Sequence, residues 1–322
     1  MKLKFSQHLK TKRTLLVLLL TFFGIVHASA QKTTNSVSQS FDELSKAAEN
    51  GDASAMFAFA LTNNARGEFK VAADWFYKAA ENGYVASQVR FGIICLKGQG
   101  VEQNITQAAQ WFQKAADQTN SAAQFFLGMC YQTGLGVKQD DAMVEKWMRK
   151  SAEQGFVEAE YFLGEMYSIG KQVPQNFPEA VKWFSRAASR GHAVAQYYLG
   201  QSYVFGRGVG VNYPEAVKRF RLAAQQGDAP AQRELGVALA KGLGTPVDEI
   251  ESYKWLSLAA AQEDERAKNY LAISNQLMNE SDIAEGRRRL AYFVPQRTAA
   301  SLASDQILAM FHNTLNQTVS PK

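Results

Sequence analysis

The sequence predicts an all-α fold, a solenoid of about six to seven antiparallel helix pairs. Three columns of residues recur along the chain with a spacing of 36 positions. They are a Leu-Gly step (Leu127-Gly128, Leu163-Gly164, Leu199-Gly200 and Leu235-Gly236), a tryptophan (Trp111, Trp147, Trp183 and Trp255) and a lone glycine (Gly155, Gly191 and Gly227). A fixed period of this size is typical of stacked supersecondary units, not of one globular core.

Residues 1–30 are expected to be a signal peptide that is removed after Ala30. Basic residues precede an apolar stretch of twelve residues, Leu15 to Val26, and Ala28 and Ala30 supply small side chains for cleavage. Twelve apolar residues are too few to span a bilayer, so we expect no stable membrane insertion after cleavage. The mature protein is therefore expected in the periplasm or outside the cell.

Export also changes the meaning of the charge. The whole chain carries a formal net charge of +5, but residues 1–30 hold five basic and no acidic residues. The mature chain is then close to neutral, which removes the main electrostatic argument for nucleic-acid binding.

The mature chain has two cysteines, Cys95 and Cys130, in adjacent repeats. An oxidising compartment permits a disulfide between them, and two buried thiols are the alternative, because the distance between them cannot be derived from sequence. Besides the cysteines, only His192 and His312 offer soft metal ligands. We predict no metal and no cofactor.

Residues 31–40 are polar without apolar periodicity and are expected to be a flexible linker. Residues 41–296 then hold the repeats. In a first helix, Ala159, Leu163 and Tyr167 recur at i, i+4 and i+8, which is one face of an α-helix. The first helices are predicted to open near Asp52, Tyr84, Asn120, Phe156, His192 and Asp228.

Each second helix is predicted to start after an Asn or Asp, because these side chains accept a hydrogen bond from a free amide at a helix start. This column is Asn104, Asp140, Asn176, Asn212 and Asp248. Glu179, Glu215 and Glu251 lie three residues further on, which predicts a capping box. The lone glycines then end the second helices in the left-handed conformation.

Two further glycine patterns have structural interpretations. The glycine inside each first helix, such as Gly164, predicts close packing of another helix, since a mid-helix glycine otherwise costs roughly 0.5–1 kcal/mol. A G-x-G step recurs between the helices of a unit, as in Gly206 and Gly208. It follows a helix and not a strand, so it predicts a tight turn instead of a phosphate-binding loop.

The pattern changes near the C-terminus. Residues 264–278 and 281–293 are predicted to be two helices that cap the solenoid with a polar face. The run Arg287, Arg288 and Arg289 is interpreted as a solvated face. Residues 297–322 are a tail, with one more helix expected near 298–315.

The repeat, A-x-x-x-L-G-x-x-Y-x-x-G-x-G-V followed by N/D-x-x-x-A-x-x-W-F-x-x-A-A-x-x-G, resembles the Sel-1-like repeat (SLR) family, a relative of the tetratricopeptide repeat. The resemblance covers residues 41–296. It implies a right-handed superhelix that holds a protein or peptide partner on its concave face, and an adaptor or scaffold of the cell envelope or a secreted one. The alternatives from other classes are a peptidoglycan- or β-lactam-related envelope enzyme and a glycan-binding scaffold.

The sequence offers no catalytic constellation. Ser168 and Lys171 match S-x-x-K, but Lys171 lies in the recurring turn, and neither S-D-N nor K-T-G accompanies the motif. His192 follows a helix-ending glycine and is expected to be exposed or to cap a helix. The carboxylates are expected on helix surfaces, without an inward pair.

We predict a binding surface on the first helices. The first column is the residue before the leucine of each Leu-Gly step. The second column lies three residues after the first, and both are off the core face. The candidate partner-binding residues are Arg90, Phe126, Phe162, Glu165, Tyr198 and Gln201. The three rings would form an aromatic ladder suited to a peptide or a partner helix. The alternative, that these rings pack between repeats as the tryptophans are expected to do, stays open.

Overall fold

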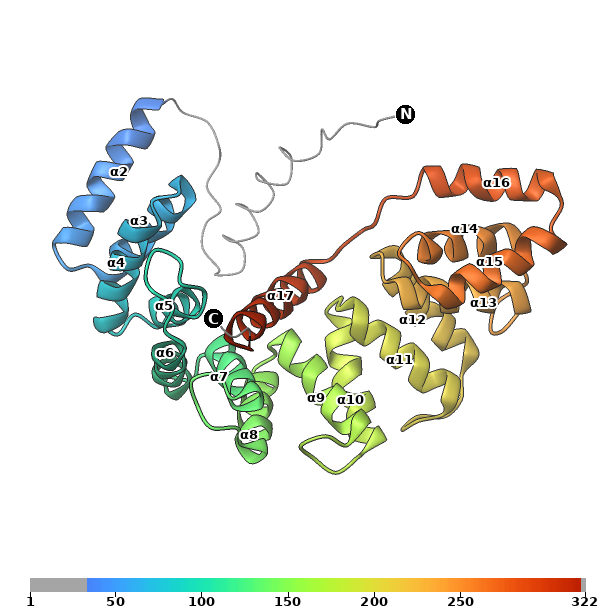
Figure 1. The fold of residues 1–322 in the computed structure, drawn as a ribbon, viewed down its shortest axis with the longest axis horizontal. Coiled ribbons are helices and arrows are strands. Elements are labelled where there is room, and N and C mark those ends of the chain that lie inside the picture. The colour runs from blue at the N-terminus through green and yellow to red at the C-terminus, as the bar shows by residue number, and fades with distance from the viewer. Residues whose placement is uncertain (1–33, 320–322) are drawn as a thin grey trace. The chain divides into compact units, whose positions relative to one another are not determined.

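The computed structural model describes residues 34–319, which form helices and turns without a strand (Figure 1). The expected all-α solenoid is confirmed, because consecutive helices pack pairwise along the chain. The chain divides into two compact units, residues 1–139 and residues 140–322. The predicted signal peptide, with its cleavage after Ala30, lies outside the described residues. None of the described helices is both long and apolar enough to cross a bilayer.

The first unit contains α2 to α7. Their bounds are α2 Thr34–Glu49, α3 Ala53–Arg66, α4 Phe69–Glu81, α5 Val85–Lys97, α6 Ile105–Asp117 and α7 Ser121–Thr133. The pairs α3/α4 and α5/α6 are the hairpins, and α4 and α6 also pack against the first helix of the next pair. Helix α2 begins inside the segment that the sequence predicted as a flexible linker, and it packs against α3.

The second unit contains α8 to α17. Their bounds are α8 Asp141–Glu153, α9 Val157–Ile169, α10 Phe177–Ser189, α11 Ala193–Phe205, α12 Tyr213–Gln225, α13 Ala229–Lys241, α14 Glu249–Ala260, α15 Glu265–Leu277, α16 Glu280–Ala291 and α17 Ala299–Val319. Here the hairpins are α9/α10, α11/α12 and α13/α14. Trp147, Trp183 and Trp255, which recur at multiples of 36 residues, are buried in the core, as expected.

Helix starts follow the predicted columns. The six residues at which the sequence predicted the first helices to open occupy the N-cap positions, and all except Tyr84 and Phe156 accept a capping hydrogen bond. The second helices start after the predicted Asn or Asp, and Asn176 Oδ1 accepts from the Glu179 N–H at 3.1 Å. The second bond of the predicted capping box, from the Asn176 N–H to the Glu179 side chain, does not form, because the Asn176 N–H donates to Tyr167 O at 2.9 Å. This part of the prediction is wrong. Glu179 pairs with Lys182 instead, at 3.2 Å.

The glycine within each first helix allows a ring of the second helix to approach, as predicted. A Cβ on Gly164 would lie 2.5 Å from the ring of Phe184, and one on Gly200 would lie 2.6 Å from the ring of Phe220. These distances are shorter than any carbon–carbon contact in a packed core. The paired helices therefore depend on the missing side chain.

The cysteines are two free, buried thiols, so the disulfide alternative does not hold. Burial raises the pKa of Cys95 to about 11 and that of Cys130 to about 12. Both thiols stay protonated near neutral pH, which makes them poor nucleophiles.

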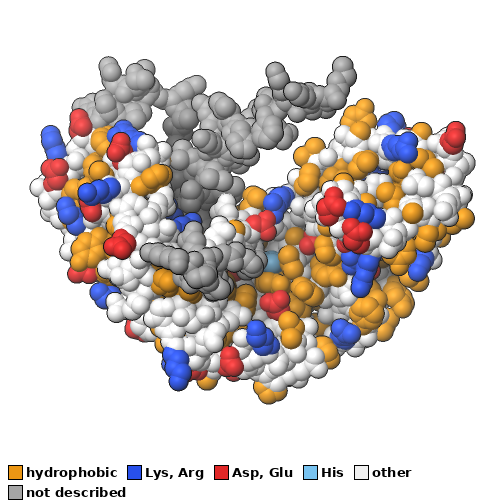
Figure 2. All heavy atoms as spheres, in the orientation of Figure 1, with side chains coloured by type: hydrophobic (Ala, Val, Ile, Leu, Met, Phe, Trp, Pro, Cys, Tyr) orange, Lys and Arg blue, Asp and Glu red, His pale blue; other side chains and the backbone are white. Residues whose placement is uncertain are grey.

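The C-terminal helices leave the repeat pattern. Helices α15 and α16 both pack against α14, so the expected terminal pair does not form a hairpin of the repeat type. Apolar side chains are visible on the surface (Figure 2), and Ile273, Leu277, Tyr292 and Val294 are each more than half exposed. The cap is thus less polar than predicted. After α16 the chain turns back, and α17 packs against α9 and α11, two first helices of the second unit (Figure 1).

Candidate functional site

The predicted binding residues are divided between the two units. Arg90 on α5 and Phe126 on α7 belong to the first unit. The second unit holds Phe162 and Glu165 on α9, and Tyr198 and Gln201 on α11. Phe126 and Phe162 are buried, whereas the other four residues are partly exposed. Whether these six residues bind a partner stays a prediction, but two of the three rings of the expected ladder pack inside the protein.

Ring contacts explain this burial. Phe126 stacks on Phe112 of the preceding hairpin, with ring centroids 5.1 Å apart. In the second unit, Tyr198 stacks on Phe184 at 5.3 Å and on Tyr161 at 6.3 Å. Tyr161 is the ring that connects α9 to α11, and the sequence analysis passed over its column.

Arg90 lies in an apolar setting. Its guanidinium lies over the ring of Phe76, 5.8 Å from the centroid, and burial lowers the pKa of Arg90. Arg90 Nε has no hydrogen-bond partner among the described residues. A charged group with little water around it interacts strongly with an opposite charge, and binding of a partner by Arg90 stays a prediction.

The S-x-x-K match is part of the repeat. The carbonyl of Ser168 accepts from Gln175 Nε2, at 2.9 Å. The same contact joins Gln139 to Gln132 in the preceding repeat, at 3.1 Å. The backbone of Ser168 thus makes the same turn contact as the equivalent residue of the preceding repeat.

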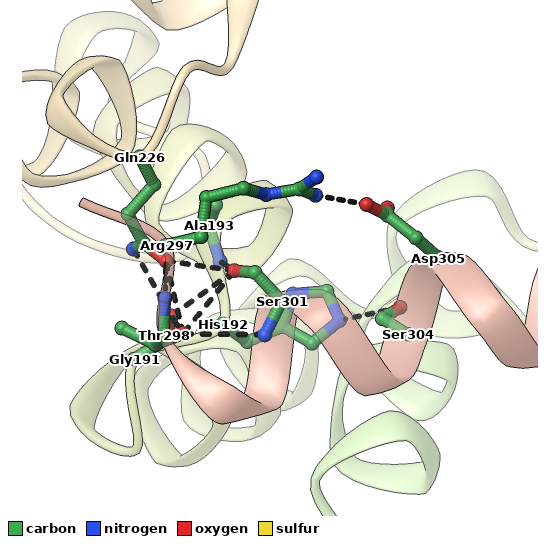
Figure 3. Close-up of polar contacts among 9 residues, drawn as sticks. All are labelled: Gly191, His192, Ala193, Gln226, Arg297, Thr298, Ser301, Ser304 and Asp305. Atoms are coloured by element: carbon green, nitrogen blue, oxygen red, sulfur yellow. Dashed lines mark hydrogen bonds and ion pairs between the residues drawn. The ribbon is translucent and has the colours of Figure 1, made fainter. Parts of the chain in front are cut away.

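A cluster of polar contacts in the second unit lies where residues 295–305 meet the turns before α11 and α13 (Figure 3). Thr298 Oγ1 lies 2.8 Å from Gly191 O and 2.9 Å from Gln226 Oε1. Ser301 Oγ lies 2.8 Å from Gln226 Oε1 and accepts from the Ala193 N–H at 3.0 Å. Hydroxyl groups thus hold the start of α17 on two consecutive repeat turns.

His192 is buried at the same place, with 1% of its surface exposed. Its Nδ1 accepts from the Ala195 N–H at 3.1 Å, and its ring stacks on Tyr161 at 4.6 Å. Of the two alternatives expected from sequence, exposed or capping, the capping role is confirmed, and the ring is buried beside α17. Burial lowers the pKa of His192 to about 4, so the ring is neutral near neutral pH.

The bond to Ala195 also fixes the tautomer of His192. A neutral imidazole whose Nδ1 accepts must carry its proton on Nε2. His192 Nε2 therefore donates to Ser304 Oγ, 3.2 Å away. A general base must accept the hydroxyl proton, and neither nitrogen of His192 is free to do so. The contact between Ser304 and His192 is a structural hydrogen bond and not a nucleophile–base pair.

A cleft of about 450 Å³ opens beside this contact. Its polar lining includes His192, Gln226, Asp228, Arg297 and Asp305. Burial raises the pKa of Asp228 to about 6, and Arg297 pairs with Asp305. Within residues 34–319 no group of three or more His, Cys, Asp or Glu side chains could hold a metal ion.

A column of glutamines joins consecutive repeats, and the sequence analysis missed it. Each of these first-helix glutamines donates through Nε2 to a carbonyl of the preceding second helix, at 3.1–3.3 Å. The four are Gln88, Gln124, Gln196 and Gln232. Gln226 Nε2 donates to Gln196 Oε1, and Gln262 Nε2 donates to Gln232 Oε1, both at 2.9 Å. The signal in the sequence was the column itself, polar at a buried position.

One repeat carries a charged version of this joint. Glu160 takes the glutamine place and has no exposed side-chain surface. Arg186 Nε donates to Glu160 at 2.9 Å, and Arg190 forms an ion pair with it at 3.6 Å. Arg186 Nη2 also donates to Ala152 O, at 3.1 Å, the carbonyl that a glutamine would serve. The expectation that carboxylates lie on helix surfaces is wrong here, and Glu158 is buried as well.

Comparison with known proteins agrees with the repeat phase. A family model described as Sel1 repeat matches residues 69–84, 85–120, 121–156, 157–192, 193–228 and 229–264. Helices α2, α3 and α15 to α17 lie outside the matched segments. Among curated proteins, no sequence similar to the chain was found.

Two solved structures resemble most of the chain. One is a protective antigen of uropathogenic Escherichia coli strains that displays an SLR fold, with 27% identity over 87% of this chain and a TM-score of 0.71. This chain covers 64% of that protein, less than two thirds of its length. The other is a Sel1 repeat protein from Oxalobacter formigenes, with 29% identity over 83% of this chain and 76% of that one, and a TM-score of 0.64.

Proposed function

Since the chain belongs to the Sel1 repeat family, whose solenoids typically serve as scaffolds for protein interactions, we propose that it is a non-enzymatic adaptor. In this proposal it holds a protein or peptide on the first-helix side of its second unit, on α9 and α11. It acts in the cell envelope or outside the cell after removal of residues 1–30.

One observation carries the choice of surface: the α9 and α11 side already accommodates a helix, because α17 packs there. Grooves between helices bind amphipathic helices through apolar anchors and a few polar contacts. Tyr198, Glu165 and Gln201 are partly exposed on these helices and would contact a segment bound on this side.

The exported location is supported by the leader and by one relative. The Escherichia coli protein is a protective antigen, and an antigen protects when an immune response can reach it. Similarity over 87% of the present chain favours the same location for this protein.

The proposal is tested by affinity capture from extracts of the native cell with the mature protein as bait. The variant Tyr198→Ala/Gln201→Ala removes two partly exposed first-helix side chains, and Tyr213→Ala removes an exposed tyrosine of the second helix α12 as a matched control. We expect the wild type and the control to retain the same proteins and the double variant to lose them. Equal capture by all three baits would reject this surface.

A further inference from the structure

We propose that α17 is an intramolecular ligand, which occupies the site where the protein binds a helix of its partner. The site, called the α17 seat, consists of α9, α11 and four residues at the repeat turns: Gly191, His192, Ala193 and Gln226. The inference rests on the proposed function and names the class of partner, an amphipathic helix with hydroxyl side chains in its first turns.

Helix α17 has the residue pattern of a docked ligand. Its buried side chains recur along one face, each less than a tenth exposed; they are Ala303, Ile307, Met310, Phe311 and Thr314. Between them, Asp305, Gln306, Ala309 and Asn313 are exposed. One apolar stripe and one polar face are the features by which a helix lies in a groove.

The seat is formed by the repeats themselves. The Gln226–Gln196 bond that builds it has the same 2.9 Å length as the Gln262–Gln232 bond of the next repeat. His192 and Asp228 occupy the same place in successive repeats, and each side chain caps its helix. We infer that the seat keeps its geometry when α17 leaves, because none of these contacts involves α17.

The anchoring of α17 suits release. Thr298, Ser301 and Ser304 contact the seat through hydroxyl groups, which water solvates readily on separation, and the Thr298 N–H adds one bond to Gln226 Oε1 at 3.2 Å. Interfaces of this polar kind are typical of domains that separate and rebind. The connection from α16 is also open to solvent, since Tyr292 is 79% and Val294 is 75% exposed.

The seat specifies hydroxyl groups. Gly191 O and Gln226 Oε1 require donors, whereas the Ala193 N–H and His192 Nε2–H require acceptors. A hydroxyl both donates and accepts through one atom. A carboxylate in its place would face two carbonyl oxygens. The partner helix should therefore carry Ser or Thr at positions i and i+3, as Ser301 and Ser304 do, and apolar residues at i+6, i+9 and i+10.

Because α17 is covalently tethered to the seat, a free partner helix must compete with a high local concentration of α17. A segment on a short linker reaches an effective concentration on the order of millimolar, so a free helix displaces α17 only when it binds more tightly or when α17 is weakened. Binding of a free helix to the seat can therefore be measured in the full mature chain, without removal of α17.

The experiment titrates a fluorescein-labelled peptide of residues 295–319 against the full mature protein and follows fluorescence anisotropy. The variant Ile307→Asp/Phe311→Asp places charges on the buried face of α17 and leaves the seat unchanged. The matched control, Gln306→Asp/Asn313→Asp, places the same charges on the exposed face. We expect the first variant to bind the peptide at least about tenfold more tightly than the wild type, and the control to bind like the wild type.

A milder variant, Thr298→Ala/Ser301→Ala, tests the same inference if the charged variant does not fold; it should bind the peptide several-fold more tightly than the wild type. A labelled peptide carrying Ser301→Ala/Ser304→Ala should bind less tightly to every protein. Equal affinity of the wild type and the weakened variants, or indifference to the peptide hydroxyls, overturns the inference. That result leaves the capture experiment untouched, so the two proposals fail separately.

Discussion

The joints between repeats and the seat of α17 hold helices by different means. In a joint such as α9/α10, the ring of Phe184 enters the space that Gly164 leaves open, and tryptophans and alanines fill the rest. At the seat, hydroxyls and the imidazole of His192 make the contacts. Opening a joint exposes apolar surface throughout, whereas release of α17 exposes the apolar side chains Ile307, Met310 and Phe311 but exchanges its hydroxyl hydrogen bonds for bonds to water. Under the proposal above, the repeats are the permanent scaffold and α17 is the part that moves.

The largest effect is expected from closing the space in a repeat joint. Gly164→Leu adds a side chain whose first carbon already lies 2.5 Å from the ring of Phe184. Overpacking of this kind should lower the free energy of unfolding by more than about 3 kcal/mol, measured by urea denaturation. Gly210→Ala is the matched control, because a Cβ there meets nothing within 4 Å. A Gly164→Leu protein as stable as the control would refute the close approach.

We expect the charged joint to tolerate replacement of its three charged residues together, but not the replacement of Arg186 alone. Arg186→Leu leaves the Glu160 carboxylate without its hydrogen bond and with only the 3.6 Å contact to Arg190. The expected cost is about 3 kcal/mol in unfolding free energy, because a buried charge loses its partner. Glu160→Gln/Arg186→Leu/Arg190→Gln copies the set Gln196, Leu222 and Gln226 of the next repeat.

The triple variant should recover to within about 1 kcal/mol of the wild type, since a glutamine pair restores the neutral joint. Chemical denaturation of the three proteins (the wild type, Arg186→Leu and the triple variant) measures both effects. If the triple variant were as unstable as Arg186→Leu alone, the glutamine and the charged joints would not be equivalent.

Acid should loosen the seat through His192. Its pKa is about 4 in the folded protein and near 6.5 when unfolded. The unfolded chain thus binds the proton more readily as the pH falls from about 6.5 towards 4, and stability is lost over this range. Between pH 7 and pH 4 the wild type should lose about 3 kcal/mol more unfolding free energy than His192→Asn, which retains a capping oxygen.

The comparison with His192→Asn is needed because other groups titrate in the same range with the opposite sign. Burial raises the pKa of Asp228 to about 6 and that of Glu158 to about 7, so both carboxyls favour folding at lower pH. Their effects are common to both proteins. Parallel pH profiles for the two would show that His192 does not stay neutral in the fold.

The smallest effect concerns one glutamine. Gln226→Ala removes the oxygen that accepts from Thr298 and Ser301, which should weaken α17 docking by about 1 kcal/mol. Gln262→Ala breaks only the equivalent bond between repeats, to Gln232. Tryptic cleavage after Arg297, followed by mass spectrometry, should be several-fold faster in the first variant than in the second. Equal rates would mean that Gln226 does not hold this segment.

The helices could be predicted from sequence because their starts and ends depend on local chemistry. An Asn such as Asn176 meets amides three residues away, and Gly191 ends a helix through its own backbone. The glutamine column was missed because a polar residue on a helix suggests a surface, and its partner lies 30 positions further on.

The seat of α17 could not be predicted from the sequence, for a related reason. Ser304 meets His192 across 112 positions, and no repeat pattern relates the two. Phe126 of the predicted ladder stacks on Phe112 of the neighbouring hairpin, which is the packing alternative that the sequence left open. Long-range packing of a unique segment leaves no period to detect.

Amide hydrogen exchange on the full mature chain tests most directly whether α17 is a detachable ligand on a permanent scaffold. Helices α9 and α11 should exchange only when the repeats unfold, whereas the amides of α17 should exchange at least about tenfold faster, through local release. Protection of α17 equal to that of α9 and α11 would contradict the account, because it would make α17 part of the same cooperative unit.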